Sequence, residues 1–267
     1  MNKQQLAAKI WESANKMRSK IEANEYKDYI LGFIFYKFLS ETEIARLRAE
    51  DWGAEDLKGL DENDAETVQY VRDLCGYFIS YNNLFSTWIA SQGDFTIADV
   101  RDALSAFERN IDPARKRVFV GIFDTLQTGL SKLGTDEKSR SKAVRDLIYL
   151  IKDIPMDSRQ DYDTLGFIYE YLISNFASNA GKKAGEFYTP SEVSQLMSEI
   201  VAWHLAGREE INIYDPTSGS GSLLIHIGQA VARRNGNPND IKYYAQELKE
   251  NTYNLTRMNL VMRGILP

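Results

Sequence analysis

The sequence predicts a helical N-terminal domain followed by the first part of a doubly wound α/β domain. Up to about residue 180, apolar residues recur at helical spacing and the alternation typical of strands is scarce. Beyond that point the pattern becomes strand, helix, strand, helix, an order that implies parallel pairing through a right-handed crossover. A small and basic stretch poor in apolar residues, SNAGKKAGE, separates the two patterns. We therefore expect a helical domain over residues 1–180 and a second domain over residues 181–267.

The first half contains several amphipathic segments. The clearest, 25–48, has a broad apolar surface that includes Phe33 and Ile34, and we expect this surface to be buried within its own domain. Thr96 and Asp99 fit a capping box that begins a helix at 96–110. The remaining expectations are helices over 63–80, 113–130 (after Pro113), 140–153 and 161–178, and an exposed turn or loop over 129–139.

The second half begins with a predicted helix start. Thr189 can cap this helix, Pro190 suits its first position and Glu192 completes a capping box. We expect the helix to run to about residue 206. After it, the pattern predicts a short buried strand over 211–216, a helix over 221–234, a second strand over 241–247 and a helix over 248–264.

Composition excludes several classes of protein. The single cysteine, Cys75, rules out an internal disulfide, and two histidines are too few for a Cys/His zinc cluster, so no metal site is expected. No apolar run approaches the roughly 20 residues of a membrane-spanning helix, and the N-terminus lacks the apolar stretch of a secretory signal, so we expect a cytoplasmic protein without membrane contact. A net charge of -6 argues against coating nucleic acid by bulk electrostatics.

The strongest local motif is DPTSGSGSLL, which begins at Asp215 and lies between the first predicted strand and the following helix. In open parallel sheets, ligands bind at the carboxyl ends of strands, and glycines allow a sharp turn and close approach to a ligand. A phosphate-binding P-loop would need Gly-Lys-Ser/Thr, but Ser222 and Leu223 follow Gly221. A dinucleotide fingerprint would need a small residue in place of Leu224, so NAD is less favoured. S-adenosylmethionine, which has an ammonium group and a sulfonium charge, suits a carboxylate beside a glycine turn.

A second acidic residue follows the next predicted strand. Glu247 comes after Tyr243-Tyr244-Ala245-Gln246. A carboxylate in this position can accept hydrogen bonds from both hydroxyls of a ribose. Together with the Asp215 loop, Glu247 therefore favours a ligand that contains a nucleoside.

Three segments resemble the modification subunits of type I restriction enzymes, a branch of the adenine-specific DNA methyltransferases. They are the segment EFYTPS before the sheet, the glycine motif from Asp215, and AQELKENTYNLTRMNL from Ala245. Their order and spacing match the family, and the helical first half is similar to its leading domain. Ser218 stands where many relatives have Cys or Ala, a difference that we expect to be harmless because this side chain need not contact the cofactor.

The resemblance implies the start of an S-adenosylmethionine-dependent, Rossmann-like methyltransferase domain and a role for each motif residue. The segment before the sheet would lie along the methionine end of the cofactor, the glycine motif would line its crevice and the acidic residue would hold the ribose. The residues concerned are, in that order, Glu186, Phe187, Tyr188, Thr189, Pro190 and Ser191; Asp215, Gly219, Ser220, Gly221 and Ser222; and Glu247.

The resemblance also implies methyl transfer to the exocyclic amine of adenine in DNA. In the family an Asn-Pro-Pro-Phe/Tyr motif holds the flipped base. Here the only Asn-Pro, Asn237-Pro238, has no second proline after it, so no catalytic residue is predicted and we expect an N-terminal fragment that is inactive alone. The implied partners are the specificity and restriction subunits, double-stranded DNA and a second copy of the modification subunit.

Two alternatives remain. The chain could be a non-catalytic assembly module that docks onto the specificity subunit and clasps DNA, or, less favoured by the motif order, a small-molecule methyltransferase or NAD enzyme.

Overall fold

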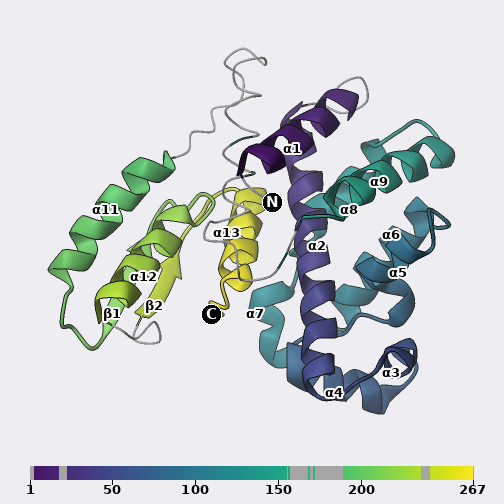
Figure 1. Ribbon diagram of the computed structural model, residues 1–267, viewed down its shortest axis with the longest axis horizontal. Coiled ribbons are helices and arrows are strands. Elements are labelled where there is room, and N and C mark those ends of the chain that lie inside the picture. Colours follow the sequence, from purple (N-terminus) through teal and green to yellow (C-terminus); the bar gives the residue numbers. More distant parts are fainter. Residues whose placement is uncertain are drawn as a thin grey trace. The chain divides into compact units, whose positions relative to one another are not determined.

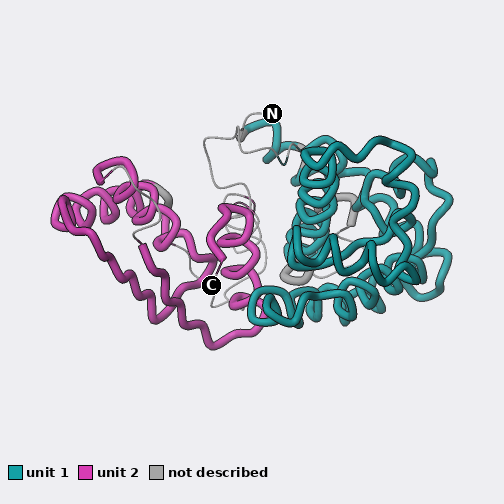
Figure 2. Tube along the Cα trace, turned by 90° about the horizontal axis from the view of Figure 1, so that it is seen from below, with its two compact units in different colours: residues 1–159 teal, residues 160–267 magenta. Residues whose placement is uncertain are grey.

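The computed structural model describes residues 3–17, 23–154, 156, 168, 171, 189–235 and 241–266. The chain forms two compact units, Met1–Arg159 (unit 1) and Gln160–Pro267 (unit 2), shown in Figure 2. The junction predicted after residue 180 lies among residues outside those described, as does nearly all of the helix predicted over 161–178.

Unit 1 is helical, and α2 (Ala23–Ala49) is the helix against which α4, α5, α8 and α9 pack (Figure 1). Phe33 and Ile34 of α2 are fully buried, so the prediction that this apolar surface is covered within its own domain is confirmed. Aromatic rings fill the space beside it, with Tyr36 stacked on Trp88 at a centroid distance of 5.1 Å. The other elements of unit 1 are α1 (Lys3–Met17), α3 (Ala54–Lys58), α4 (Ala65–Cys75), η1 (Tyr81–Asn83), α5 (Phe85–Ala90), α6 (Ile97–Arg109), η2 (Pro113–Arg115), α7 (Lys116–Phe119), α8 (Asp124–Gly129), η3 (Leu130–Lys132) and α9 (Glu137–Ile151).

Local sequence signals correctly predict some of these boundaries. The capping box of α6 is present, with the Thr96 amide donating to Asp99 Oδ2 at 2.7 Å. The helix predicted over 63–80 ends early, at Cys75, because Gly76 adopts a left-handed conformation (φ 85°) that stops helical propagation.

Two predictions in the first half are wrong. The single helix expected over 113–130 is three pieces, η2, α7 and α8, because Val120 is extended (ψ 130°) and Gly121 has a φ of 68°. The loop expected over 129–139 contains the short helix η3, and α9 starts at Glu137, where Asp136 caps it by accepting from the Ser139 amide at 2.8 Å.

Unit 2 has the predicted order of elements: α11 (Ser191–His204), β1 (Ile211–Asp215), α12 (Ser222–Asn235), β2 (Ile241–Ala245) and α13 (Glu250–Met262). The strands pair in parallel from Ile211↔Ile241 to Asp215↔Ala245. Apolar side chains from α11, α12 and the strands form the core, namely Ala202, Ile211, Ile213, Leu224, Ala230, Val231 and Ile241. Tyr243 of β2 lies against α12 at Gly228, where a Cβ atom would collide with the Tyr243 hydroxyl, and burial raises the pKa of that hydroxyl.

Two expectations for unit 2 need correction. β1 is not buried on both faces: it alternates, and Tyr214 is 58% exposed, because among the described residues only one face of the sheet is covered by helices. α11 has Pro190 rather than Thr189 as its N-cap, and no side chain caps it. With ψ at 141°, Pro190 is extended, so the helix starts one residue later than a Thr189 capping box requires. None of the described helices is long and apolar enough to cross a membrane.

Candidate functional site

The two predicted acidic motifs meet at one edge of the sheet. β1 and β2 run parallel, so the loop after Asp215 and the segment after Ala245 leave the sheet side by side. Two backbone hydrogen bonds join them: the Gln246 amide donates to the Asp215 carbonyl and the Ser218 amide to the Gln246 carbonyl, each at 2.9 Å. The topology therefore brings both motifs to the carboxyl ends of the strands, where open α/β sheets have their ligand-binding crevice.

Asp215 provides a buried acceptor in this crevice. The residue is 8% exposed, and its Oδ1 accepts from the Thr217 amide at 2.9 Å. Its Oδ2 is buried and has no hydrogen-bond partner among the described residues. Because a buried carboxylate oxygen without a partner is costly, Oδ2 suits a positively charged or hydrogen-bond-donating ligand group.

The backbone of the loop depends on its glycines. Gly219 and Gly221 have φ values of 57° and 80°, in the left-handed region that side chains disfavour. Between and after them, the hydroxyls of Ser220 and Ser222 are buried and hydrogen-bonded to each other at 2.7 Å. A ligand at this loop would therefore meet mainly backbone, and the serine hydroxyl that accepts in this bond keeps its own proton to donate.

Glu247 links the loop to α13. Its Oε2 accepts from the Gly219 amide at 3.1 Å, and its Oε1 accepts from the amides of Leu248 and Lys249 at 2.8 and 3.0 Å. A carboxylate has about four acceptor positions, so these bonds leave room for about one more donor. One ribose hydroxyl can be accepted directly, whereas a second would have to share or replace an existing bond.

The segment before the sheet reaches the same edge. α11 and α12 run side by side in the same direction, with Ser194 Oγ 2.7 Å from His226 Nδ1 near their starts and Glu199 bonded to Arg233 and Arg234 farther along. These two arginines lower the pKa of Glu199. Because the two helices run in the same direction, the start of α11 lies at the glycine-loop end of α12. This start consists of the half-buried Thr189, the exposed Pro190 and the backbone of Ser191. Glu186, Phe187 and Tyr188 lie outside the described residues.

These features fit S-adenosylmethionine. Asp215 Oδ2 is an unsatisfied anionic acceptor for a cationic group, the glycine turn exposes backbone, and Glu247 retains capacity for a hydroxyl. Within the described ranges, no three or more His, Cys, Asp or Glu side chains are grouped so that they could hold a metal ion.

The residues of α13 that support the loop lie outside the three predicted cofactor motifs' assigned roles, and no local pattern in the sequence predicted them. Thr256 and Asn259 are each 1% exposed and donate to carbonyl oxygens of the loop at 2.7 Å. Their signal in the sequence is polarity on a helix face that also buries Leu255 and Met258. An otherwise amphipathic helix with polar residues on its buried face needs partners for them inside the protein.

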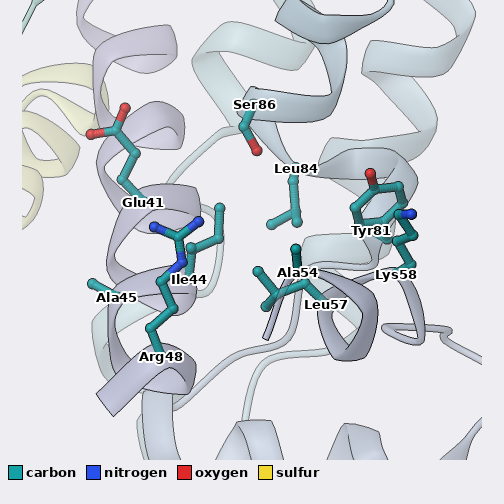
Figure 3. A pocket seen from close by; sticks show the side chains of 10 residues that line it. All are labelled: Glu41, Ile44, Ala45, Arg48, Ala54, Leu57, Lys58, Tyr81, Leu84 and Ser86. Atoms are coloured by element: carbon teal, nitrogen blue, oxygen red, sulfur yellow. The ribbon is translucent and has the colours of Figure 1, made fainter. Parts of the chain in front are cut away.

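Unit 1 contains a separate hollow of about 460 Å³ (Figure 3). Figure 3 shows residues of α2 on one side, facing Tyr81 and Lys58 on the other. Its charged groups are partly neutralised within the unit, since Lys37 pairs with Glu41 at 2.6 Å and Glu55 pairs with Lys58 at 2.7 Å. No residue predicted from the sequence to bind a ligand lines this hollow, whose lining is Glu41, Ile44, Ala45, Arg48, Ala54, Leu57, Lys58, Tyr81, Leu84 and Ser86.

Comparison with known proteins gives two family matches. Residues 6–151 match the HsdM N-terminal domain and residues 160–266 match N-6 DNA methylase. The type I restriction enzyme MpnII methylase subunit of Mycoplasma pneumoniae is 31% identical over 279 residues, which cover 96% of this chain and 50% of the relative. The MjaIX methylase subunit of Methanocaldococcus jannaschii is 25% identical, over 96% of this chain and 45% of that protein.

A solved structure is also similar over the whole chain. It is the type I restriction-modification system methyltransferase subunit from Streptococcus thermophilus, with a TM-score of 0.76 and 32% identity, covering 100% of this chain and 57% of that one. Both curated relatives match nearly all of this chain, whereas the chain spans only about half of their length.

Proposed function

Because the chain belongs to the family of type I restriction-modification methylase subunits, we propose that unit 2 binds S-adenosylmethionine in the crevice at the carboxyl ends of β1 and β2. The observation that carries this proposal is the buried Oδ2 of Asp215, which has no partner among the described residues and lies beside the glycine turn. When bound, S-adenosylmethionine supplies an activated methyl group.

Each part of the crevice has a distinct task in this proposal. Asp215 accepts from the ammonium group of the methionine end, and the turn at Gly219 and Gly221 allows the ligand to approach the backbone. Glu247 accepts from a ribose hydroxyl while it holds the Gly219 amide. The segment 186–191 borders the methionine end, which agrees with the position of its described part at the start of α11.

In the complete modification enzyme, the methyl group would pass to the exocyclic amine of adenine in double-stranded DNA. The 267 residues contain no Asn-Pro-Pro-Phe/Tyr motif to hold a flipped adenine, so we propose that this chain binds cofactor but does not methylate DNA alone. Its proposed partners, in the cytoplasm, are the specificity and restriction subunits and a second modification subunit.

Calorimetric titration with S-adenosylmethionine, with NAD as the control ligand, tests the proposal. Asp215→Asn preserves shape but removes the charge; losing a charged hydrogen bond of about 1.5–3 kcal/mol should weaken binding about 10-fold to 100-fold. Glu247→Gln should weaken binding less, because the group that Glu247 accepts from is a neutral hydroxyl and not a charged ammonium. Glu250→Gln, an exposed acidic position in the first turn of α13, is the matched control and should bind as the wild type does.

The outcomes separate the functional hypotheses. Absence of S-adenosylmethionine binding by the wild-type chain would overturn the proposal and favour an assembly module in which the α/β unit is only structural. Preferential binding of NAD would indicate a dinucleotide enzyme. Unchanged affinity in Asp215→Asn would refute the role assigned to that carboxylate.

A further inference from the structure

α13 buries polar side chains against the glycine loop. Thr256 and Asn259 are each 1% exposed, and burying a hydroxyl and an amide is unfavourable unless they are hydrogen-bonded. Thr256 Oγ1 donates to the Gly219 carbonyl and Asn259 Nδ2 to the Ser220 carbonyl, each at 2.7 Å. One helix thus holds two consecutive carbonyls of the turn.

The hydroxyl of Thr256 has a second bond that defines its direction. The hydroxyl has one proton, and it donates this proton to the Gly219 carbonyl, which is its shortest contact. In its contact with Ser218 Oγ, at 3.0 Å, Thr256 Oγ1 is therefore the acceptor. The Ser218 side chain therefore points to α13. Ser218, Thr256 and Asn259 form a support for the loop, which we call the α13 support.

The α13 support determines how the turn presents its amides. In a trans peptide the carbonyl and the N–H point in opposite directions, and the described residues contain no cis peptide bond. Because the Gly219 carbonyl points to Thr256, the Ser220 N–H points away from α13. Among the described residues this N–H has no hydrogen-bond partner, whereas the Gly219 and Gly221 amides are bonded to Glu247 and Ser218.

We propose that Thr256 and Asn259 are positioning residues that hold the glycine loop in its binding conformation and keep the Ser220 N–H available to an acceptor atom of the ligand. The inference deepens the proposed function and rests on it for the identity of the ligand. A loop rich in glycine loses much conformational entropy when it becomes ordered. Since α13 orders the loop beforehand, that loss is not incurred on binding, and affinity rises.

The test uses substitutions that alter hydrogen bonding with little change in volume. Thr256→Val removes the hydroxyl, Thr256→Ser retains it, and Asn259→Leu removes the amide donor. Thr252→Val is the matched control: the same substitution one turn earlier on α13, at a buried threonine whose hydroxyl, among the described residues, bonds only to Asn251, at 3.4 Å.

Two measurements are made on the full chain. The first is hydrogen–deuterium exchange without ligand, in which the loop amides should exchange about 10-fold faster in Thr256→Val and Asn259→Leu while α12 stays protected. The second is calorimetric titration, in which S-adenosylmethionine should bind these two variants about 10-fold more weakly. Each factor is the equivalent of one lost hydrogen bond. Thr256→Ser and Thr252→Val should resemble the wild type in both measurements.

Each result decides a separate question. If the wild type binds no S-adenosylmethionine, the proposed function fails, but exchange in the unliganded loop still decides whether the α13 support orders it. Wild-type loop exchange in both Thr256→Val and Asn259→Leu would overturn the inference. So would equal acceleration by Thr252→Val. If Thr256→Val does not fold, Asn259→Leu provides the same comparison through the other carbonyl.

Discussion

Replacing Gly221 by alanine should destabilise unit 2 more than replacing Gly219, although both glycines have positive φ in the same loop. At Gly219 (φ 57°) an added Cβ would meet, among the described residues, only the Thr217 carbonyl, at 3.9 Å. At Gly221 (φ 80°) it would lie 3.3 Å from Thr256 Cγ2. Thr256 cannot easily move, because its hydroxyl is hydrogen-bonded to the loop and the residue is almost fully buried.

The expected magnitudes follow from these contacts. A left-handed conformation costs an alanine about 1–2 kcal/mol, and the reduced entropy of the unfolded chain returns about 0.4–1 kcal/mol, so Gly219→Ala should lose about 0.5–1 kcal/mol. Gly221→Ala has the same backbone effects and adds an overpacking cost of about 1–3 kcal/mol, for a loss of about 1.5–4 kcal/mol. Combining Gly221→Ala with Thr256→Ser removes Cγ2 but keeps the hydroxyl, and should restore most of the steric part.

Because the chain has two compact units, the assay must report on unit 2 alone. Hydrogen–deuterium exchange of peptides from β1 and α12 measures the free energy of opening for that unit. Equal losses for the two alanine variants would refute the reasoning about Thr256. Failure of Thr256→Ser to rescue Gly221→Ala would show that backbone strain, and not the Cγ2 contact, is the cause.

Three further predictions concern other parts of the molecule. Burial of Glu43, whose Oε2 accepts from the Ile79 amide, raises its carboxyl pKa well above the ordinary 4.5. The contribution of Glu43 to the stability of unit 1 is therefore fully present below about pH 4.5 and is lost as the pH rises through the raised pKa, so Glu43→Gln should make the slope of stability against pH less negative in urea unfolding between about pH 5 and about pH 8. A steeper slope in Glu43→Gln would contradict this. Burial raises the pKa of the Cys75 thiol to about 12, so a thiol reagent at neutral pH should label it only after unfolding; rapid labelling of the native chain would count against a closed core. On α11, Leu196 and Ile200 form an apolar stripe and are 64% and 61% exposed, so the chain should self-associate. Sedimentation velocity should show that the double variant Leu196→Ser, Ile200→Ser is monomeric. A wild type that stays monomeric at high concentration would exclude self-association through this stripe.

Signals that act over a few residues are those that the sequence predicted well. The capping box at Thr96, the parallel strands around Asp215 and the helices that follow them arise from local hydrogen bonding and from apolar periodicity. The glycine motif and Glu247 were identifiable for the same reason, since both lie directly after strands. The capping box at Thr189 failed although it is also local, because the extended backbone of Pro190 moves the helix start by one residue.

What the sequence determined by itself is the order of the elements and the edge of the sheet at which the glycine motif and Glu247 meet. Tertiary structure alone decided which polar groups are satisfied there. Within the described part of the chain, Asp215 Oδ2 has no hydrogen-bond partner, whereas Thr256 and Asn259 hold the turn, and both facts depend on contacts between segments far apart in the chain. The buried position of Glu43 is decided in the same way. Hydrogen bonds and burial of this kind depend on three-dimensional neighbours, which periodicity and local motifs do not encode.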